Sequence, residues 1–313
     1  MGRGFIAMAL LEKQRTEAGA GNPRPRLSLR TKDRLSAVPF LVGPVALVGV
    51  MLLVPFVATA YQSLTDDDGF TSSFIGFDNY VALLEDPTFV RSLLNTLLWT
   101  VGTLILPVGI GLLIAVLTNA VPGGRWLKYV FVLPYALSGT ATAVIWGFIL
   151  RSDGALNQAI EFFGGDAAAS GWLLTWPTNT IVMIVASTWQ ATGVTVILFM
   201  IGLQAIPKEV VQAGELDGAS GLRLFWHVIL PQLRPVTIVV IGMSIANSLR
   251  VFDLIWLLTK GGPGAASETL AVTMYRQTFI LSDYGAGAAV AVVLSVIVVG
   301  ASWFYLRHQY KRG

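Results

Sequence analysis

The stretch IPKEVVQAGELDGASGLRLFWHVILPQLRPV, residues 206–236, lies between two apolar segments and decides how the rest of the chain is interpreted. Pro207 suits the first turn of a helix, where its missing N–H would have no partner in any case. Gly218-Ala219 interrupts that helix, and Ser220 can cap a second one. Leu230-Pro231 is expected to end the second helix, because proline disfavours helical geometry in the residue before it. The stretch therefore predicts two short helices joined by a hinge of small residues.

Composition places the chain in a membrane. Of its 313 residues 54% are hydrophobic and 12% are charged, and the mean hydropathy is +0.68. A soluble domain carries about 25% charged residues. The chain has no cysteine, which excludes disulfides, thiolate catalysis and cysteine-bound metals. Its two histidines, His227 and His308, are far apart, so a histidine metal site is not expected.

Six segments are long and apolar enough to span a bilayer, which takes about 20 residues. They lie at residues 38–61, 93–120, 126–150, 178–204, 235–258 and 284–306. All are predicted to be helices, because an open sheet cannot satisfy its backbone groups in lipid. The predicted fold is an all-α polytopic membrane protein. Residues 1–35 form a basic cytosolic tail, and residues 36–313 form one transmembrane domain of six helices.

The distribution of Lys and Arg predicts the orientation. Sixteen of the 21 basic residues lie on the side of the N-terminus, four lie on the other side, and Arg250 lies within a span. Basic residues accumulate on the cytoplasmic side of membrane proteins. Both termini and the 206–235 loop are therefore predicted to be cytoplasmic. Cysteines placed at Ser72, Ser170 and Ser267 should react with a thiol reagent from outside, and one placed at Ser220 should not.

The 206–236 stretch resembles the cytoplasmic EAA loop of the membrane subunits of ABC importers. The family pattern is E-A-A, three residues, G, nine residues and I-x-L-P. Here these places hold Gln212-Ala213-Gly214, Gly218 and Val228-x-Leu230-Pro231, so that Gln212 replaces the acid and Gly214 replaces the second alanine. The resemblance implies that the loop at 206–235 couples the chain to an ATPase through Glu209, Gln212, Ala213, Gly214, Asp217, Gly218 and Ala219.

A second stretch narrows the resemblance. FDLIWLLTKGGPGAASETLAVTMY, residues 252–275, is similar to the fifth span and outer loop of sugar-importing ABC permeases, and GFDNYVALLEDPTFVRSLLNTLLWT, residues 76–100, is similar to their first outer loop. The resemblance implies a type I ABC importer permease with six spans in the bacterial inner membrane. The partners it implies are a second homologous permease subunit, a cytosolic ATPase dimer that holds ATP and magnesium, an extracytoplasmic solute-binding protein and a sugar. No nucleic-acid partner is expected.

The chain carries no ATP site of its own. The pattern G-x-x-x-x-G-K-[ST], which cradles phosphates, is absent from the sequence. The chain is therefore predicted to be a transport subunit rather than an enzyme, with no cofactor of its own.

Candidate pathway residues follow from the chemistry of sugars, which are neutral and rich in hydroxyl groups. Amide, hydroxyl and aromatic groups in spans suit such a solute, and the candidates are Trp189, Gln190, Thr192, Asn247, Ser248 and Asp253. The alternative for Ser and Thr is a hydrogen bond to the backbone of their own helix. Arg250 and Asp253 are three residues apart in the fifth span, so they can share a helix face and pair. Such a pair either lines the pathway or neutralises itself near the outer interface.

Two other classes remain open. A secondary transporter driven by an ion gradient would show internal repeats with broken helices in both halves, and the 206–236 pattern has no second copy. A membrane enzyme would need a cluster of acids or histidines near an interface. Asp66-Asp67-Asp68 is the dense acidic run of the sequence, and a solvated loop explains it.

Overall fold

The computed structural model describes residues 29–121, 124–165 and 171–310. The chain divides into two compact units, Met1–Val57 and Ala58–Gly313. Residues 1–28, most of the predicted basic tail, lie outside the described residues. Helix α2 begins at Leu29 and ends at Gln62, and its part Phe40–Gln62 has a mean hydropathy of 2.5 and the length of a membrane span.

The second unit begins with the last residues of α2, and a short hairpin follows them. Strands β1 (Thr65–Asp67) and β2 (Ser72–Phe74) pair antiparallel, with Thr65 opposite Phe74. At the turn, the Asp68 carboxylate accepts hydrogen bonds from the backbone N–H groups of Thr71 (2.7 Å) and Phe70 (2.9 Å). These bonds hold the pKa of Asp68 below its usual range. The acidic run thus serves a turn, and the described residues contain no group of acids and histidines that could hold a metal.

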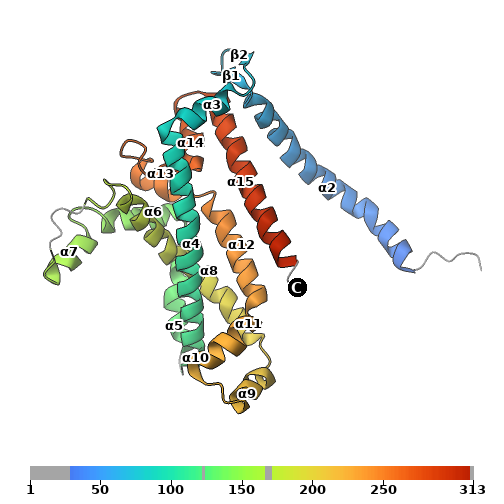
Figure 1. The fold of residues 1–313 in the computed structure, drawn as a ribbon, viewed down its shortest axis with the longest axis vertical. Coiled ribbons are helices and arrows are strands. Elements are labelled where there is room, and N and C mark those ends of the chain that lie inside the picture. The colour runs from blue at the N-terminus through green and yellow to red at the C-terminus, as the bar shows by residue number, and fades with distance from the viewer. Residues whose placement is uncertain (1–28, 122–123, 166–170, 311–313) are drawn as a thin grey trace, which may run out of the picture. The chain divides into compact units, whose positions relative to one another are not determined.

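The remaining elements are helical. Their bounds are α3 Asp78–Glu85, α4 Pro87–Ala120, α5 Gly124–Val132, η1 Leu133–Ala136, α6 Gly139–Ile149, α7 Ala155–Phe162, α8 Thr178–Gln204, α9 Lys208–Leu216, α10 Gly221–Leu224, η2 Phe225–Ile229, α11 Leu230–Gln232, α12 Arg234–Ser248, α13 Asp253–Thr259, α14 Leu270–Tyr275, η3 Arg276–Ile280 and α15 Tyr284–Tyr310. Figure 1 shows α9, α10 and α11 at one end of the second unit, and the hairpin, α3 and α14 at the opposite end.

Helices α4, α8 and α12 pack together at the centre of the second unit. Glycines on α4 let α8 approach closely, because a Cβ at Gly102 would lie 2.7 Å from Cγ2 of Ile184, and one at Gly111 would lie 2.6 Å from Cγ2 of Thr195. Lipid tails are as apolar as the side chains between these helices. Close packing and hydrogen bonds, rather than the hydrophobic effect, therefore stabilise the contact.

Four of the six predicted spans are confirmed as single helices, and the other two overlap bent pairs of helices. Among the described residues, the helices that could cross a membrane are Phe40–Gln62, Pro87–Asn119, Thr178–Gln204 and Tyr284–Tyr305. The bent pairs are Lys128–Ala136 with Gly139–Ile149 (108°) and Gly221–Gln232 with Arg234–Ser248 (72°), which makes six spans if each pair is one span.

The expectation of one continuous helix over residues 126–150 was wrong. Pro134 lies in the 3₁₀ segment η1, where its missing N–H interrupts the α-helical ladder. Ser138 then starts α6, and its Oγ accepts the N–H of Ala141 (3.1 Å). The carbonyl of Leu137 at the bend accepts a hydrogen bond from Nε2 of Gln190 (2.6 Å). A break inside a span is tolerated when the freed backbone groups find such partners.

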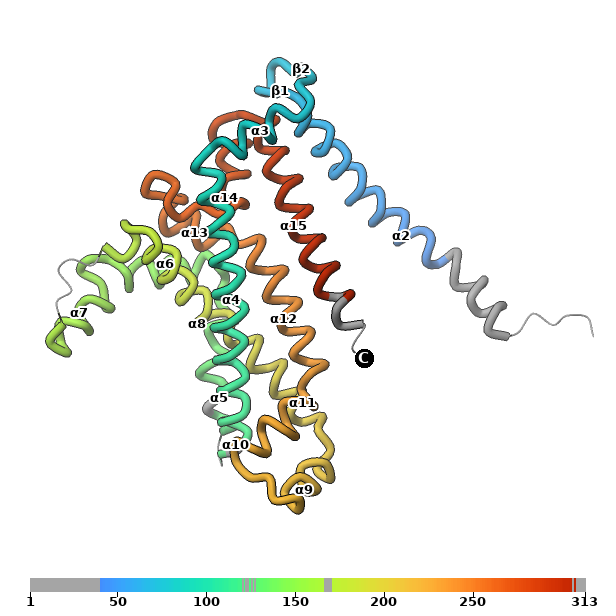
Figure 2. The backbone as a smooth tube through the Cα atoms, in the orientation of Figure 1, coloured from blue at the N-terminus to red at the C-terminus, as the bar shows by residue number. Residues whose placement is uncertain are grey.

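The expectation of one helix over residues 235–258 was also wrong. Helix α12 ends at Ser248, and α13 begins at Asp253. Figure 2 shows α12 and α13 as separate parts of the backbone tube. Ser248 Oγ donates to the carbonyl of Ile245 (2.9 Å), and Nε of Arg250 donates to the carbonyl of Ala246 (3.1 Å). These side chains satisfy carbonyls in the last turn of α12, as basic residues commonly do at helix C-termini.

Candidate functional site

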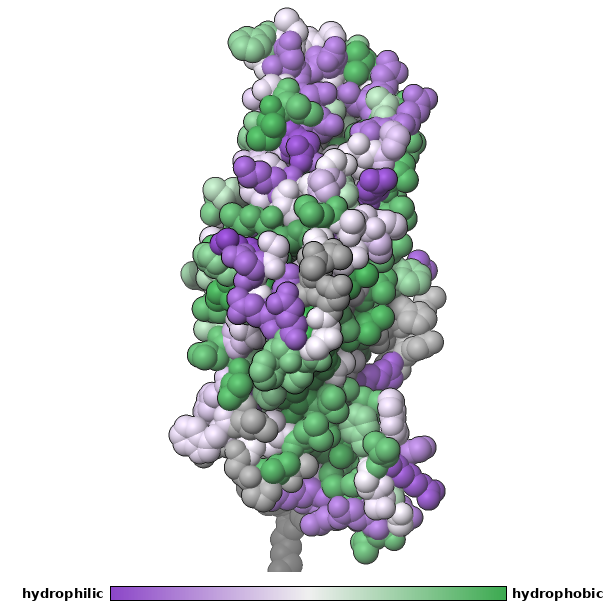
Figure 3. All heavy atoms as spheres, turned by 90° about the vertical axis from the view of Figure 1, so that its left-hand side faces the viewer, coloured by the Kyte–Doolittle hydropathy of each residue, from purple (hydrophilic) through white to green (hydrophobic). Residues whose placement is uncertain are grey.

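The 206–235 loop is a helical hairpin, as predicted. Helix α9 carries Glu209 in its first turn, next to the partial positive charge of a helix N-terminus. The side chains of Glu209, Gln212 and Ala213 are exposed, so a partner could contact them directly. Figure 3 shows polar side chains gathered at the end of the molecule where α9–α11 lie in Figure 1, with apolar side chains above them.

The hinge at the end of α9 has the hydrogen bonds of a Schellman motif. Gly218 has a φ of +79°, the left-handed conformation that glycine adopts without penalty. Its N–H donates to the carbonyl of Glu215 (3.0 Å), and the N–H of Ala219 donates to that of Gly214 (3.0 Å). The predicted need for glycine at 218 is confirmed. Asp217 is the exposed C-cap residue of α9.

Gly214 has a packing role that explains its departure from the E-A-A pattern. A Cβ at Gly214 would lie 2.9 Å from Cγ2 of Val228 and 3.1 Å from Cδ1 of Leu224. The two arms of the hairpin are therefore in close contact at this position, and even alanine would push them apart by a few tenths of an ångström.

Two expectations for the second arm of the hairpin were wrong. Ser220 lies at the N-cap of α10, but its side chain makes no capping hydrogen bond. Pro231 does not end the helix, because α10 continues through the π-helical segment η2 into α11. The wider turn of a π-helix shifts the carbonyl that would collide with a proline in an α-helix.

A groove of about 570 Å³ runs beside α9. Gln212 lies in its wall together with Gln204 at the end of α8 and Ile229 of η2. The groove therefore places one candidate coupling residue, Gln212, beside the C-terminal end of α8. The other candidate coupling residues lie on α9 or in the turn that follows it, within the same hairpin.

A second hollow, here called the central cavity, lies between α4, α8 and α12. Its volume is about 90 Å³, and its lining residues are Trp99, Thr103, Pro107, Ser187, Ala191, Val194, Thr195, Leu198, Val240, Met243, Ser244, Asn247, Ser248 and Val251. None of these is charged. Since a water molecule takes roughly 30 Å³ in the liquid, the cavity has room for a few waters and must widen to pass a larger solute.

The central cavity brings together two of the predicted pathway residues, Asn247 and Ser248. Three others have different partners. Trp189 packs edge-on against Trp146, with ring centroids 6.3 Å apart. Gln190 supports the bend of the third span through Leu137, as described above. Thr192 is buried and donates to the carbonyl of Thr188 (2.7 Å), the backbone bond that the alternative interpretation anticipates.

Arg250 and Asp253 do not form the expected pair. Arg250 lies in the break between α12 and α13, and its Nη2 donates to Oδ1 of Asn247 (3.3 Å). Asp253 begins α13, and its Oδ2 would lie 3.3 Å from a Cβ at Gly139, the first residue of α6. A carboxylate at two helix N-termini is favourable. Within the described residues, the ion pairs are Arg151–Asp153 and Arg276–Glu268.

Several lining residues were not predicted. Trp99, Thr103, Ser187 and Ser244 resemble ordinary residues of apolar helices, and only the packing of three helices shows that they face one hollow. Trp99 is the most informative of them, since its buried indole N–H has no hydrogen-bond partner among the described residues.

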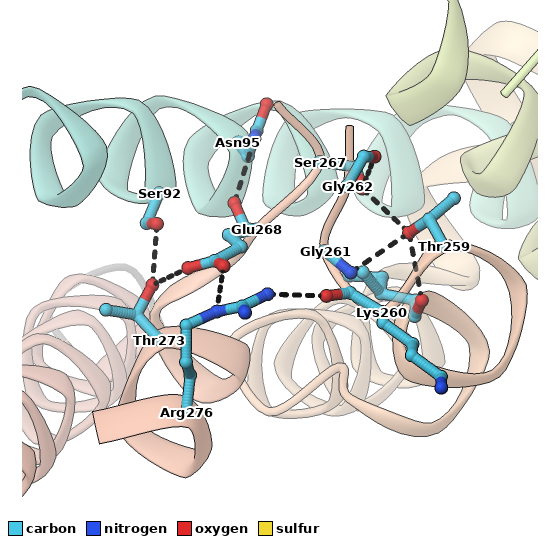
Figure 4. A network of polar contacts seen from close by, with 11 residues as sticks. Ser92, Asn95, Thr259, Lys260, Gly261, Gly262, Ser267, Glu268, Thr273 and Arg276 are labelled. Atoms are coloured by element: carbon cyan, nitrogen blue, oxygen red, sulfur yellow. Dashed lines mark hydrogen bonds and ion pairs between the residues drawn. The ribbon is translucent and has the colours of Figure 1, made fainter. Parts of the chain in front are cut away.

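At the opposite end from the 206–235 loop, polar side chains form the network in Figure 4. Glu268 is completely buried, forms an ion pair with Nε of Arg276, and accepts a hydrogen bond from Oγ1 of Thr273 (3.0 Å). Arg276 also donates to the carbonyl of Lys260 (2.6 Å). A Cβ at Gly261 would collide with Cγ of Glu268, so only glycine fits there. Removing one partner of such a pair costs roughly 3–5 kcal/mol.

Known proteins share this architecture. Residues 107–311 match the family described as binding-protein-dependent transport system inner membrane component. A probable ABC transporter permease protein of Pyrococcus horikoshii is 34% identical over 290 residues, covering 90% of this chain and 98% of that protein. The sn-glycerol-3-phosphate transport system permease protein UgpA of Rhizobium meliloti is 32% identical over 281 residues (87% and 94%).

A solved structure shares the fold. One chain of a bacterial alginate ABC transporter, crystallised with an alginate pentasaccharide-bound periplasmic protein, superposes with a TM-score of 0.75 at 20% identity, covering 90% of this chain and 96% of that one. With a family match over most of its length and relatives above 30% identity along nearly all of it, the chain belongs to the inner membrane components of binding-protein-dependent transport systems, the permease subunits of ABC importers.

Proposed function

We propose that the chain imports a neutral carbohydrate or polyol and forms half of the pathway, with a second homologous permease subunit forming the other half. The central cavity carries this proposal, because its polar lining groups are hydroxyls, an amide and the indole N–H of Trp99, and none is charged. A neutral solute rich in hydroxyl groups can exchange hydrogen bonds with such a lining. An anionic solute would require a basic group to compensate its charge.

Energy enters from a cytosolic ATPase pair that holds ATP and magnesium. The helical hairpin α9–α11 supports this part of the proposal, since it presents Glu209, Gln212, Ala213 and Asp217 on an exposed surface and keeps its shape through Gly214 and Gly218. Docking of the ATPase on α9 would move the hairpin and widen the central cavity toward each side in turn. An extracytoplasmic binding protein would deliver the solute to the opposite end.

Uptake by a reconstituted complex tests the proposed substrate class. The chain is placed in proteoliposomes with a partner permease, an ATPase pair and a solute-binding protein. The complex is then offered labelled neutral disaccharides, polyols and sugar phosphates. We expect ATP-dependent uptake of a neutral solute. Uptake of sugar phosphates alone would refute the substrate class, and uptake driven by an ion gradient without ATP would favour the secondary transporter.

We also propose that the membrane is the bacterial inner membrane and that both termini are cytoplasmic. Single cysteines test this orientation without background labelling, because the natural chain has none. Ser72→Cys and Gly264→Cys, both exposed, should react with a membrane-impermeant maleimide in intact cells, and the exposed Ser220→Cys should react only after lysis. Ser267 is unsuitable, because it is buried and bonded to Thr259, and Ser170 lies outside the described residues. Labelling of Ser220→Cys in intact cells would reverse the orientation.

A further inference from the structure

Asn95 of α4 is completely buried, and its side-chain amide joins three separate parts of the chain. Its Nδ2 donates to the carbonyls of Ala266 (2.9 Å) and Glu268 (2.8 Å). Its Oδ1 accepts from Nε1 of Trp176 (2.9 Å) and from Oγ1 of Thr180 (3.3 Å). Both donors and both acceptor positions of the amide are used. No other natural side chain of similar size offers the same set.

The neighbours of Asn95 on α4 hold the same segment. Ser92 exchanges a hydrogen bond with Oγ1 of Thr273 (2.6 Å), and Oγ1 of Thr96 accepts the N–H of Leu270 (3.0 Å). Residues 92, 95 and 96 share a helix face, since residues three and four apart are neighbours on a helix. Residues 259–276 are therefore bound to α4 along one of its turns (Figure 4). The ion pair between Glu268 and Arg276 links two parts of this segment to each other.

The same segment touches the central cavity. Oγ1 of Thr269 donates to the carbonyl of Val251 (3.2 Å), a residue that lines the cavity at the break of the fifth span. Trp99, four residues along α4 from Asn95, also lines the cavity and belongs to one buried cluster with Val272 of α14. Residues 259–276 thus lie against the end of the cavity that is remote from the coupling hairpin.

We propose that residues 259–276 form an outer cap that closes the central cavity from the extracytoplasmic side, and that Asn95 is the residue that positions it. The direction "outer" rests on the proposed orientation of the chain. Because the cap is bound to α4 and α8 through a buried amide, it opens only when the outer ends of these helices move. Loss of Asn95 releases the cap and exposes the cavity to the outside without any signal from the ATPase.

A cysteine in the cavity reports on the cap. Ser244→Cys, on α12, is placed in the otherwise cysteine-free chain, and the full complex is labelled from outside with an impermeant thiol reagent in the absence of ATP. We expect slow labelling with Asn95 present and labelling at least about tenfold faster with Asn95→Leu, because the cap loses all of its bonds to the amide.

Asn157→Leu is the matched control. Asn157 is buried like Asn95, and its Oδ1 also accepts an indole N–H, from Trp172 (2.7 Å), while its Nδ2 donates to the carbonyl of Ser152 (3.0 Å). Trp172 and Ser152 lie outside residues 259–276, so labelling of Ser244→Cys should stay at the slow rate. Equal acceleration in both variants would mean general loosening of the fold and would overturn the proposal.

Thr269→Val tests whether residues 259–276 close the cavity if the Asn95→Leu variant does not accumulate. The substitution keeps the size of the side chain and removes its hydrogen bond to Val251. We expect labelling of Ser244→Cys to be faster in Thr269→Val than in the natural background, but by less than in Asn95→Leu.

We also expect ATP hydrolysis to continue in Asn95→Leu while uptake per ATP falls, a change that simple instability would not produce. Unchanged labelling in the variants that accumulate overturns the cap. Labelling needs no transported solute, so this result stays separate from a failure of the proposed carbohydrate uptake.

Discussion

Gly218→Asp is expected to lower solute uptake by roughly 100-fold, the effect of losing about 3 kcal/mol at an interface hot spot. The backbone of Gly218 has a φ of +79°, and its two neighbouring hydrogen bonds fix the angle between the arms of the hairpin. A side chain there strains the backbone and projects from the surface that the ATPase is proposed to contact. The measurement is uptake per milligram of complex, together with the amount of ATPase that copurifies.

Gly164→Asp is a close control for backbone strain. Gly164 has a φ of +81°, and a Cβ there would meet nothing within 4 Å, as at Gly218. It follows α7, away from the hairpin. The two variants should insert in similar amounts, and only Gly218→Asp should lose the ATPase. Normal copurification and uptake in Gly218→Asp would remove the hairpin from the coupling mechanism.

Asn247→Leu is expected to reduce uptake at least about tenfold, because a solute hydroxyl that loses its hydrogen-bond partner in a narrow passage costs about 1–3 kcal/mol. Asn247 supplies the amide of the central cavity, and leucine of similar volume leaves a passing hydroxyl without a partner. ATP hydrolysis should still respond to the binding protein. The two rates, measured on the same proteoliposomes, separate a pathway defect from a coupling defect.

Two further variants, Asn247→Gln and Arg250→Ala, test whether the loss of uptake comes from the amide group itself. The Asn247→Gln variant keeps an amide in the cavity and should recover part of the uptake. Arg250 bonds to Asn247 and to the end of α12 rather than to Asp253, so its removal does not strand a buried acid. Arg250→Ala should therefore accumulate within about twofold of the natural chain, as expected for an exposed side chain. Normal uptake in Asn247→Leu would mean that the central cavity is not on the pathway.

The sequence predicts the spans well where apolar length is the only requirement. The expected span at residues 178–204 coincides with α8, and the spans expected at 38–61, 93–120 and 284–306 agree with their helices within several residues at each end. The hinge of the hairpin was also predictable, because glycine is the residue that a left-handed helix end requires. These features depend on composition and on local backbone preferences.

The breaks could not be predicted in the same way. Residues 249–252 contain neither glycine nor proline, and α12 ends there because distant groups satisfy the freed backbone, including Thr269 at the carbonyl of Val251. The Arg250–Asp253 pair failed for the same reason, since helical spacing was assumed across a break. Asn95 was not singled out because a lone asparagine in an apolar span gives no hint of the two carbonyls it binds.

The junction at Leu233 determines how far a movement of the hairpin can travel. Leu233 joins α11 to α12 without an intervening loop, across a bend of 72°, and is fully buried against a cluster containing Ala115, Phe199 and Val240. Leu233 can therefore serve as the pivot about which the hairpin and α12 tilt together. The 15 residues of α12 form an arm about 22 Å long. A tilt of about 10° at the hairpin end would displace the far end of that arm, where Asn247 and Ser248 lie, by about 4 Å. That distance exceeds the diameter of a water molecule, so a small tilt of the hairpin, if it is transmitted through Leu233, would change the width of the central cavity.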